Sequence, residues 1–283
     1  MKGCAMTARS GKKPTWVVDK ERSRKASAAE TVWLFGLHAV RDALMNPARK
    51  RLRLMVTKNA ADKLAEAIAV AGIEPEMVDP RKFSAPIAPE SVHQGAALEV
   101  KPLDWGGLEG VAIRSEGPSD ASGDTFGDTS GGAPRLILLD RVTDPHNVGA
   151  ILRSAEVLGA QGVIAPARSS APETGALAKT ASGALERMPY LRVRNLSDAM
   201  RSLRDMGYLL IGLDGEADTT LGAALAGQGD RAIALVLGAE GPGLRDKTKE
   251  TCDQLVRIDA AGSFGSLNVS NAAAVALYAS RNC

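Results

Sequence analysis

Aromatic residues, cysteines and histidines are all scarce in this chain of 283 residues. Phe, Trp and Tyr make up only 4% of it, so a hydrophobic core has to be built mainly from Ala, Val, Leu and Ile. The three cysteines show no paired spacing, which argues against a disulfide framework and favours a reducing, cytoplasmic environment. The three histidines lie far apart with no Cys-x-x-Cys nearby, so we expect no metal site.

Long apolar runs are also missing. None approaches the roughly 18 residues that a transmembrane helix needs, and the N-terminus lacks the apolar segment of a secretory signal. The remaining composition, with 45% hydrophobic and 24% charged residues, is ordinary for a globular protein. We therefore expect a chain that neither spans a membrane nor is exported.

The net charge of +2 conceals a segregation of charge along the chain. Residues 1–30 contain eight Lys or Arg against three Asp or Glu, whereas residues 103–134 contain one against six. The basic leader, which we expect to be disordered, suits a polyanion such as RNA, but a solubilising tail explains the charge equally well. Residues 103–134 also hold eight Gly and four Ser, which predicts a flexible acidic linker.

This linker divides the chain into two globular parts, residues 31–102 and residues 135–283. The first combines short helical and strand patterns, which predict a small α/β binding module. Its expected elements are a helix over 36–44, a strand over 51–57, a helix over 60–71, and strands at 76–78 and 96–100.

The second part alternates apolar strands with helices, which predicts an α/β domain with a mostly parallel sheet and a site at the carboxyl ends of the strands. Strands are expected at 136–140, 162–165, 190–193, 208–213, 232–237 and 255–258. Helices are expected over 145–158, 173–187, 197–206 and 268–281.

Three loops of the second part carry its polar residues: 140–153, 237–244 and 258–272. The second reads Leu-Gly-Ala-Glu-Gly-Pro-Gly-Leu, and its glycines allow a ligand to approach the backbone closely. It lacks both the Gly-x-Gly-x-x-Gly fingerprint and a following Gly-Lys-Ser/Thr, which disfavours a dinucleotide or P-loop site. A Rossmann dehydrogenase would need that fingerprint after the first strand, where the sequence Asp140-Arg141-Val142-Thr143 lacks it.

Each loop also has a simpler structural interpretation. On spacing alone, Arg153 pairs with Glu156 on a solvated face of its helix. Ser266 and Asn268 cap the final helix, although capping and ligand contact can coexist. Glu240 is harder to explain in this way, because a glycine-rich turn does not require a carboxylate.

The three loops resemble, in order, the three motifs of the SpoU/TrmH family of RNA ribose 2′-O-methyltransferases, part of the SPOUT superfamily. The resemblance rests on Asn147 and Arg153, on Leu-Gly-Ala-Glu-Gly-x-Gly, and on Ser-Leu-Asn-Val-Ser, and it covers residues 135–283. The first part, with Gly36-Leu37-His38-Ala39-Val40 and Val92-His93-Gln94-Gly95, looks like the L30e-like substrate-binding domain of this family.

The resemblance implies an S-adenosylmethionine-dependent homodimer that methylates a guanosine of 23S rRNA and contains a deep C-terminal trefoil knot. Cofactor-contacting backbone would lie at Gly238, Ile258 and Leu267. The residues implied in catalysis or substrate placement are Asn147, Arg153, Glu240, Ser266 and Asn268.

The proposed chemistry assigns Arg153 an electrostatic role. A guanidinium with a pKa above about 12 is a poor base, so Arg153 is expected to stabilise the alkoxide that develops on the ribose. The sequence leaves open a tRNA ribose methyltransferase and a non-catalytic RNA-binding factor. In each of these interpretations the partner is RNA rather than DNA or a membrane.

Overall fold

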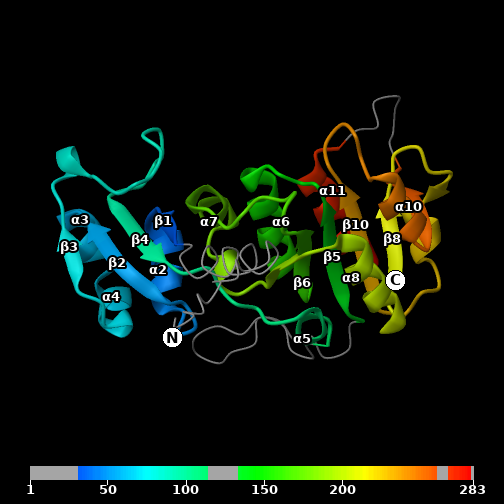
Figure 1. Ribbon diagram of the computed structural model, residues 1–283, viewed down its shortest axis with the longest axis horizontal. Helices are drawn as coiled ribbons and strands as arrows, with labels where there is room; N and C mark the ends of the chain where they lie inside the picture. Colours follow the sequence, from blue (N-terminus) through cyan, green and yellow to red (C-terminus); the bar gives the residue numbers. More distant parts are fainter. Residues whose placement is uncertain (1–30, 114–132, 260–266, 282–283) are drawn as a thin grey trace, which may run out of the picture. The chain divides into compact units, whose positions relative to one another are not determined.

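The computed structural model describes residues 31–113, 133–259 and 267–281 (Figure 1). The basic leader and Ser266 lie outside these residues, so what was expected of them stays a prediction. No helix in the described ranges is long and apolar enough to cross a membrane.

The first part is a four-stranded sheet in the order β1-β4-β2-β3, with β4 antiparallel to both neighbours and β3 parallel to β2 (Figure 1). Its elements are β1 (Val32–Phe35), α2 (Leu37–Met45), β2 (Arg51–Val56), α3 (Lys58–Lys63), α4 (Ala65–Ala71), β3 (Pro75–Met77), η1 (Pro80–Lys82) and β4 (Ala96–Val100). The helix expected over 60–71 is two helices, because Leu64 leaves the helical conformation (φ −104°, ψ 7°).

The two segments that carried the resemblance in this part lie side by side. The side chain of Gln94 accepts a hydrogen bond from the backbone N–H of Leu37 at 3.0 Å, at the start of α2. Gln94 itself takes a left-handed conformation (φ 53°), which directs the loop before β4 back toward that helix. One segment therefore caps the other.

The second part is a seven-stranded parallel sheet in the order β7-β6-β5-β10-β8-β11-β9. Figure 1 labels its central strands β6, β5, β10 and β8. Its strands are β5 (Arg135–Asp140), β6 (Gly162–Pro166), β7 (Tyr190–Val193), β8 (Leu209–Leu213), β9 (Thr219–Thr220), β10 (Ile233–Gly238) and β11 (Gln254–Arg257). The helical elements are α6 (Pro145–Val157), α7 (Gly175–Ala181), η2 (Ala184–Glu186), α8 (Leu196–Asp205), α9 (Leu221–Leu225), α10 (Asp246–Thr251) and α11 (Val269–Arg281). The predicted parallel α/β arrangement is confirmed.

Both faces of this sheet are covered, as the apolar run of β5 requires. Ile137 and Leu139 face a cluster that contains apolar residues of α6, α7 and α11. Leu136 and Leu138 face the opposite cluster, which contains residues of α8. All four side chains are fully buried, so the central strand is anchored from both sides.

The helix expected over 173–187 is interrupted. Ser182 (φ 51°) and Gly183 (φ 91°) take left-handed conformations between α7 and η2. A Cβ atom at Gly183 would fall 1.7 Å from Asp42 Oδ2, so only glycine lets this turn pass α2. Helix α7 therefore ends where the chain passes α2, which lies more than a hundred residues earlier in the sequence. The local sequence pattern does not predict a contact over such a separation.

The segment expected to be a flexible linker is ordered at its start. Helix α5 (Leu108–Ala112) lies within it, and Val111 and Ala112 are 1% and 4% exposed against the cluster of Leu136 and Leu138. The prediction of a flexible linker rested on the low aliphatic content of residues 103–134 and overlooked the few apolar residues of α5. Their helical spacing places them on one face of that helix. The prediction of flexibility is therefore wrong for residues 103–113, and residues 114–132 lie outside the described chain.

The two parts are joined by direct contacts. Helix α7 packs on β1, and the side chain of Arg49, after α2, is fully buried with the carboxylates of Glu173 and Glu186. Burial lowers the pKa of Arg49, but both carboxylates outweigh it and the net shift is upward. The knot implied by the resemblance depends on the path through residues 260–266, which lies outside the described ranges and so stays a prediction.

Candidate active site

The first two loops meet because their strands are neighbours. Strands β5 and β10 pair in parallel, with Gly238 directly opposite Asp140 at their carboxyl ends. The chain after β5 enters α6, and the chain after β10 enters the glycine-rich turn. Both loops therefore open on the same edge of the sheet, which is where parallel α/β proteins place their sites.

Three predicted residues, one from each loop, form a hydrogen-bonded cluster. Glu240 Oε1 accepts hydrogen bonds from Asn147 Nδ2 at 3.1 Å and from Asn268 Nδ2 at 2.5 Å. Asn268 Nδ2 also donates to Asn147 Oδ1 at 2.9 Å, which closes the triangle. Segments up to 121 residues apart thus converge on one carboxylate.

Asn268 combines this contact with helix capping. Its Oδ1 accepts hydrogen bonds from the backbone N–H of Ser270 at 2.9 Å and of Asn271 at 3.4 Å, which satisfies the first turn of α11. The backbone N–H of Val269 in turn reaches Glu240 Oε1 at 3.4 Å. The start of α11 and the carboxylate of Glu240 are therefore held by one another.

The glycine-rich turn folds back on its own strand. The N–H of Gly243 donates to the carbonyl of Ala239 at 2.9 Å. A Cβ atom at Gly238 would lie 2.2 Å from the carbonyl carbon of Gly243, closer than packed atoms come, so the turn requires glycine there. Gly238 is therefore packed closely against the turn and is half-buried at the edge of the sheet.

Asp140 fixes the far end of this turn. Its buried carboxylate accepts hydrogen bonds from the N–H of Arg245 at 3.0 Å and from Thr248 Oγ1 at 2.8 Å. Arg245 Nη2 adds an ion pair at 2.7 Å. Sequence reasoning did not select Asp140, although an acidic residue that ends an otherwise apolar strand is a recognisable signal.

Asp214 is a second residue that sequence reasoning missed. It follows β8, and its carboxylate lies 2.6 Å from Lys249 Nζ and accepts the N–H of Glu216 at 3.1 Å. The hydrogen bond with Lys249 holds the pKa of Asp214 below its usual value. Strand β8 lies between β10 and β11, so Asp214 marks the middle of the edge between Gly238 and Ile258.

Arg153 takes part in none of the hydrogen bonds of the cluster. It is exposed on α6, and none of the described residues pairs with its guanidinium. The expected ion pair with Glu156 is wrong, because the carboxylate of Glu156 binds Arg187, which also lies 3.4 Å from Asp42 Oδ2. Within the described ranges, no carboxylate neutralises the cation of Arg153.

The positions expected to contact a cofactor lie on the same edge. Gly238 and Ile258 are half-buried where β10 and β11 end, and Leu267 is 47% exposed directly before Asn268. Half-buried backbone and an uncovered leucine suit a cofactor with a flat apolar ring and a polar tail. No group of three or more His, Cys, Asp or Glu among the described residues could hold a metal ion.

Comparison with known proteins defines the class. The SpoU rRNA Methylase family matches residues 134–278, and the family of RNA 2′-O ribose methyltransferase substrate binding domains matches residues 33–105. The chain therefore belongs to the SpoU rRNA methylase family. The resemblance inferred from the three loops is confirmed.

Named relatives extend over most of the chain. It is 35% identical over 254 residues to the 23S rRNA (guanosine-2′-O-)-methyltransferase RlmB of Vibrio vulnificus (strain CMCP6), which covers 87% of this chain and 94% of that protein. It is 48% identical over 171 residues to RlmB of Burkholderia sp, covering 60% of this chain and 68% of that protein. An AdoMet-bound rRNA methyltransferase from Sinorhizobium meliloti shares the fold, with a TM-score of 0.71, 21% identity, and coverage of 92% and 90% of the two chains.

Proposed function

We propose that this protein transfers a methyl group from S-adenosylmethionine to the ribose 2′-hydroxyl of a guanosine in 23S rRNA. The observation that carries the proposal is the triangle of Asn147, Glu240 and Asn268 at the carboxyl edge of the sheet. It occurs in a chain whose curated relatives, matched over up to 96% of their length, carry the name of this activity.

The cofactor, when bound, supplies an electrophilic methyl group on a sulfonium. Backbone groups at Gly238, Ile258 and Leu267 hold it, since they lie along the edge beside the triangle. The residues fit because the backbone of Gly238 and Ile258 is only half-buried there and Leu267 is 47% exposed. The proposed contacts need no metal ligand.

The triangle positions the nucleophile. Glu240 Oε1 is occupied by Asn147, Asn268 and Val269, whereas Oε2 has no partner among the described residues. That second oxygen can accept the hydrogen bond of a ribose hydroxyl and direct the hydroxyl oxygen toward the methyl group. Alignment of this kind converts a bimolecular encounter into an ordered reaction. Ser266, by the family resemblance, contributes to substrate placement.

Arg153 acts on charge rather than on position. The 2′-hydroxyl must lose its proton as the new bond forms, and a guanidinium stabilises the negative charge that develops on the oxygen. Arg153 lies six residues after Asn147 on α6, about 9 Å along the helix axis. Its guanidinium is proposed to reach the same ribose oxygen that Glu240 Oε2 orients, and the proton of that hydroxyl passes to this carboxylate oxygen, to which it is hydrogen-bonded.

The active form is a homodimer in the cytoplasm. Val275 and Tyr278 on α11 are 43% and 64% exposed, and Val157 at the end of α6 is 71% exposed. Exposed apolar side chains on packed helices favour burial against a second copy. The N-terminal part, together with the basic leader, supplies further RNA contacts.

The proposal is tested with purified full-length protein, S-adenosylmethionine carrying a labelled methyl group, and separate 23S rRNA and tRNA transcripts. We expect label in 23S rRNA, located by alkaline hydrolysis, which spares the bond next to a 2′-O-methylated ribose. Label found only in tRNA would instead support the alternative, a tRNA ribose methyltransferase. Binding of either RNA without methyl transfer would indicate a non-catalytic binding factor.

A further inference from the structure

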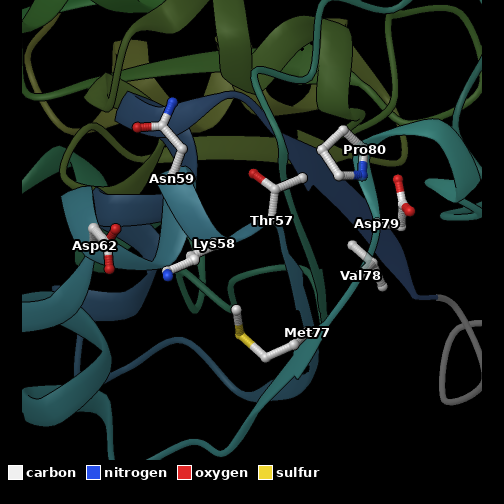
Figure 2. Close-up of a pocket in the computed structure, with 8 residues that line it drawn as sticks. All are labelled: Thr57, Lys58, Asn59, Asp62, Met77, Val78, Asp79 and Pro80. Carbon is white, nitrogen blue, oxygen red and sulfur yellow. The ribbon is translucent and has the colours of Figure 1, made fainter.

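A hollow in the N-terminal part belongs to no site described so far. It has a volume of about 700 Å³ and lies where β2 passes into α3 and where β3 ends (Figure 2). The side chains at the start of α3 and those after β3 lie on opposite sides of it (Figure 2). None of the residues of the three-loop site lines this hollow.

One wall of the hollow is apolar and uncovered. Met77 is 57% exposed at the end of the edge strand β3, and Val78 and Pro80 continue the wall. A methionine left in water loses the stabilisation of burial, whereas its polarisable sulfur makes favourable contacts with aromatic rings. The wall therefore suits a flat ring system.

The polar groups on the two sides differ in kind. Lys58 and Asn59, at the start of α3, offer N–H donors, and neither has a side-chain partner among the described residues. On the other side, Asp79 Oδ1 accepts the N–H of Arg81 at 2.8 Å, which fixes the carboxylate and leaves Oδ2 as an acceptor. The ligand must present acceptors on one edge and N–H donors on another.

Charge excludes a phosphate as the main occupant. Asp62 and Asp79 both line the hollow against a single cation, Lys58, so its formal charge is negative. Guanine matches the arrangement, because O6 and N7 accept hydrogen bonds while N1–H and the 2-amino group donate them side by side. Asp79 Oδ2 can accept one of those N–H groups, and Oδ1, which already accepts from Arg81, keeps a second lone pair for the other.

We propose that this hollow binds an unpaired guanine of the RNA substrate, other than the methylated one, with Asp79 accepting from its Watson–Crick edge and Met77 lying against its ring. The inference rests on the proposed function, because it takes RNA as the substrate. The hollow lies within residues 33–105, the part matched by the substrate-binding family. Reading one unpaired base there gives the enzyme a way to select its RNA before the reactive ribose is placed.

The test measures binding of full-length protein to fluorescent uridine oligonucleotides that contain one central guanosine or one inosine. Inosine lacks the 2-amino group, so wild-type protein should bind the guanosine oligonucleotide about tenfold more tightly. Asp79→Asn keeps the acceptor for Arg81 but presents an amide to the guanine N–H groups, and it should abolish this ratio. Asp104→Asn is the matched control, because exposed Asp104 makes the same local bond to Gly106 N, at 2.9 Å, outside the hollow.

The ratio of the two affinities, rather than either affinity, is the readout, because removing a negative charge strengthens binding to any RNA. Equal binding of the two oligonucleotides by wild-type protein, or a full ratio in Asp79→Asn, would overturn the inference. A ratio retained in Asp79→Asn would place the discrimination at the methylation site instead. Methyl transfer to 23S rRNA, measured on the same preparation, separates failure of this inference from failure of the proposed function.

Discussion

Arg49 and Glu186 form a bidentate ion pair across the junction of the two parts. Arg49 Nε donates to Glu186 Oε2 at 2.9 Å, and Nη2 donates to Oε1 at 2.7 Å. Arg49 Nη1 reaches Glu173 Oε1 at 2.5 Å, and Asn46 Nδ2 donates to Glu186 Oε2 at 3.0 Å. The N-terminal part is thus fastened to the catalytic part by one buried cation between two buried carboxylates.

Replacing Arg49 leaves both carboxylates buried without a counter-charge. Arg49→Met should lower the free energy of unfolding by about 3–5 kcal/mol, the scale of a broken buried ion pair. Urea denaturation at neutral pH measures this. The control is Arg53→Met, because Arg53 pairs with Glu76 at the surface, and its loss should leave stability nearly unchanged. An equal effect in both variants would contradict the role of the buried pair.

The buried carboxyl group of Glu173 predicts an unusual dependence of the free energy of unfolding on pH. Burial raises its pKa above the ordinary value of 4.5, and Arg49 offsets this only in part. The folded protein then holds a proton that the unfolded chain has lost, so this group stabilises the fold below pH 4.5 and loses that effect as pH rises through the folded pKa. Unfolding of Glu173→Gln, measured against wild type from neutral to acid pH, should lack this component. Parallel curves for the two proteins would refute the assignment.

Gly238 should be intolerant of a side chain. A methyl group there would collide with the backbone of Gly243 at 2.2 Å, so Gly238→Ala displaces the turn that carries Glu240. Calorimetric titration with S-adenosylmethionine should show affinity reduced at least about tenfold, a loss on the scale of one binding contact. Gly215→Ala is the control, because no atom lies within 4 Å of the added carbon and the residue follows β8 on the same edge.

Arg153→Ala should reduce single-turnover methylation by about 100-fold or more, the scale of one lost preorganised donor. Cofactor affinity should be unchanged, because the cofactor contacts belong to the other loops. Arg153→Lys should not restore turnover, since an ammonium lacks the planar fork. Arg231→Ala, which changes an exposed arginine before the opposite end of β10, is the control. Normal turnover in Arg153→Ala would remove this residue from the site.

The exposed face of α11 predicts dimerisation. Light scattering at micromolar concentration should give twice the 29.5 kDa of the chain, and Tyr278→Arg should give the monomer mass. Val70→Arg changes an equally exposed apolar residue, at 61%, on the N-terminal part and should leave the dimer intact. A wild-type protein that stays monomeric would contradict the proposal.

The sequence predicts local elements well but fails to predict contacts between residues that lie far apart along the chain. The strands and the three loops were predictable, because alternating apolar segments place loop residues at one sheet edge. The pairing of Arg153 with Glu156 was expected from spacing and was wrong, since Arg187 lies 31 residues beyond Glu156 and binds it instead. The pair of Arg49 and Glu186, 137 residues apart, left no local signal at all.

The double role of Asn268 also determines when the polar cluster can form as the chain is synthesised and folds. Its side chain both begins α11 and completes the triangle around Glu240, so the polar cluster cannot exist before that last described helix is in place. During synthesis, residues 268–281 leave the ribosome after every other described element. On the proposed mechanism, a chain that has folded both of its sheets can bind RNA through its N-terminal part but cannot methylate it until the final helix docks.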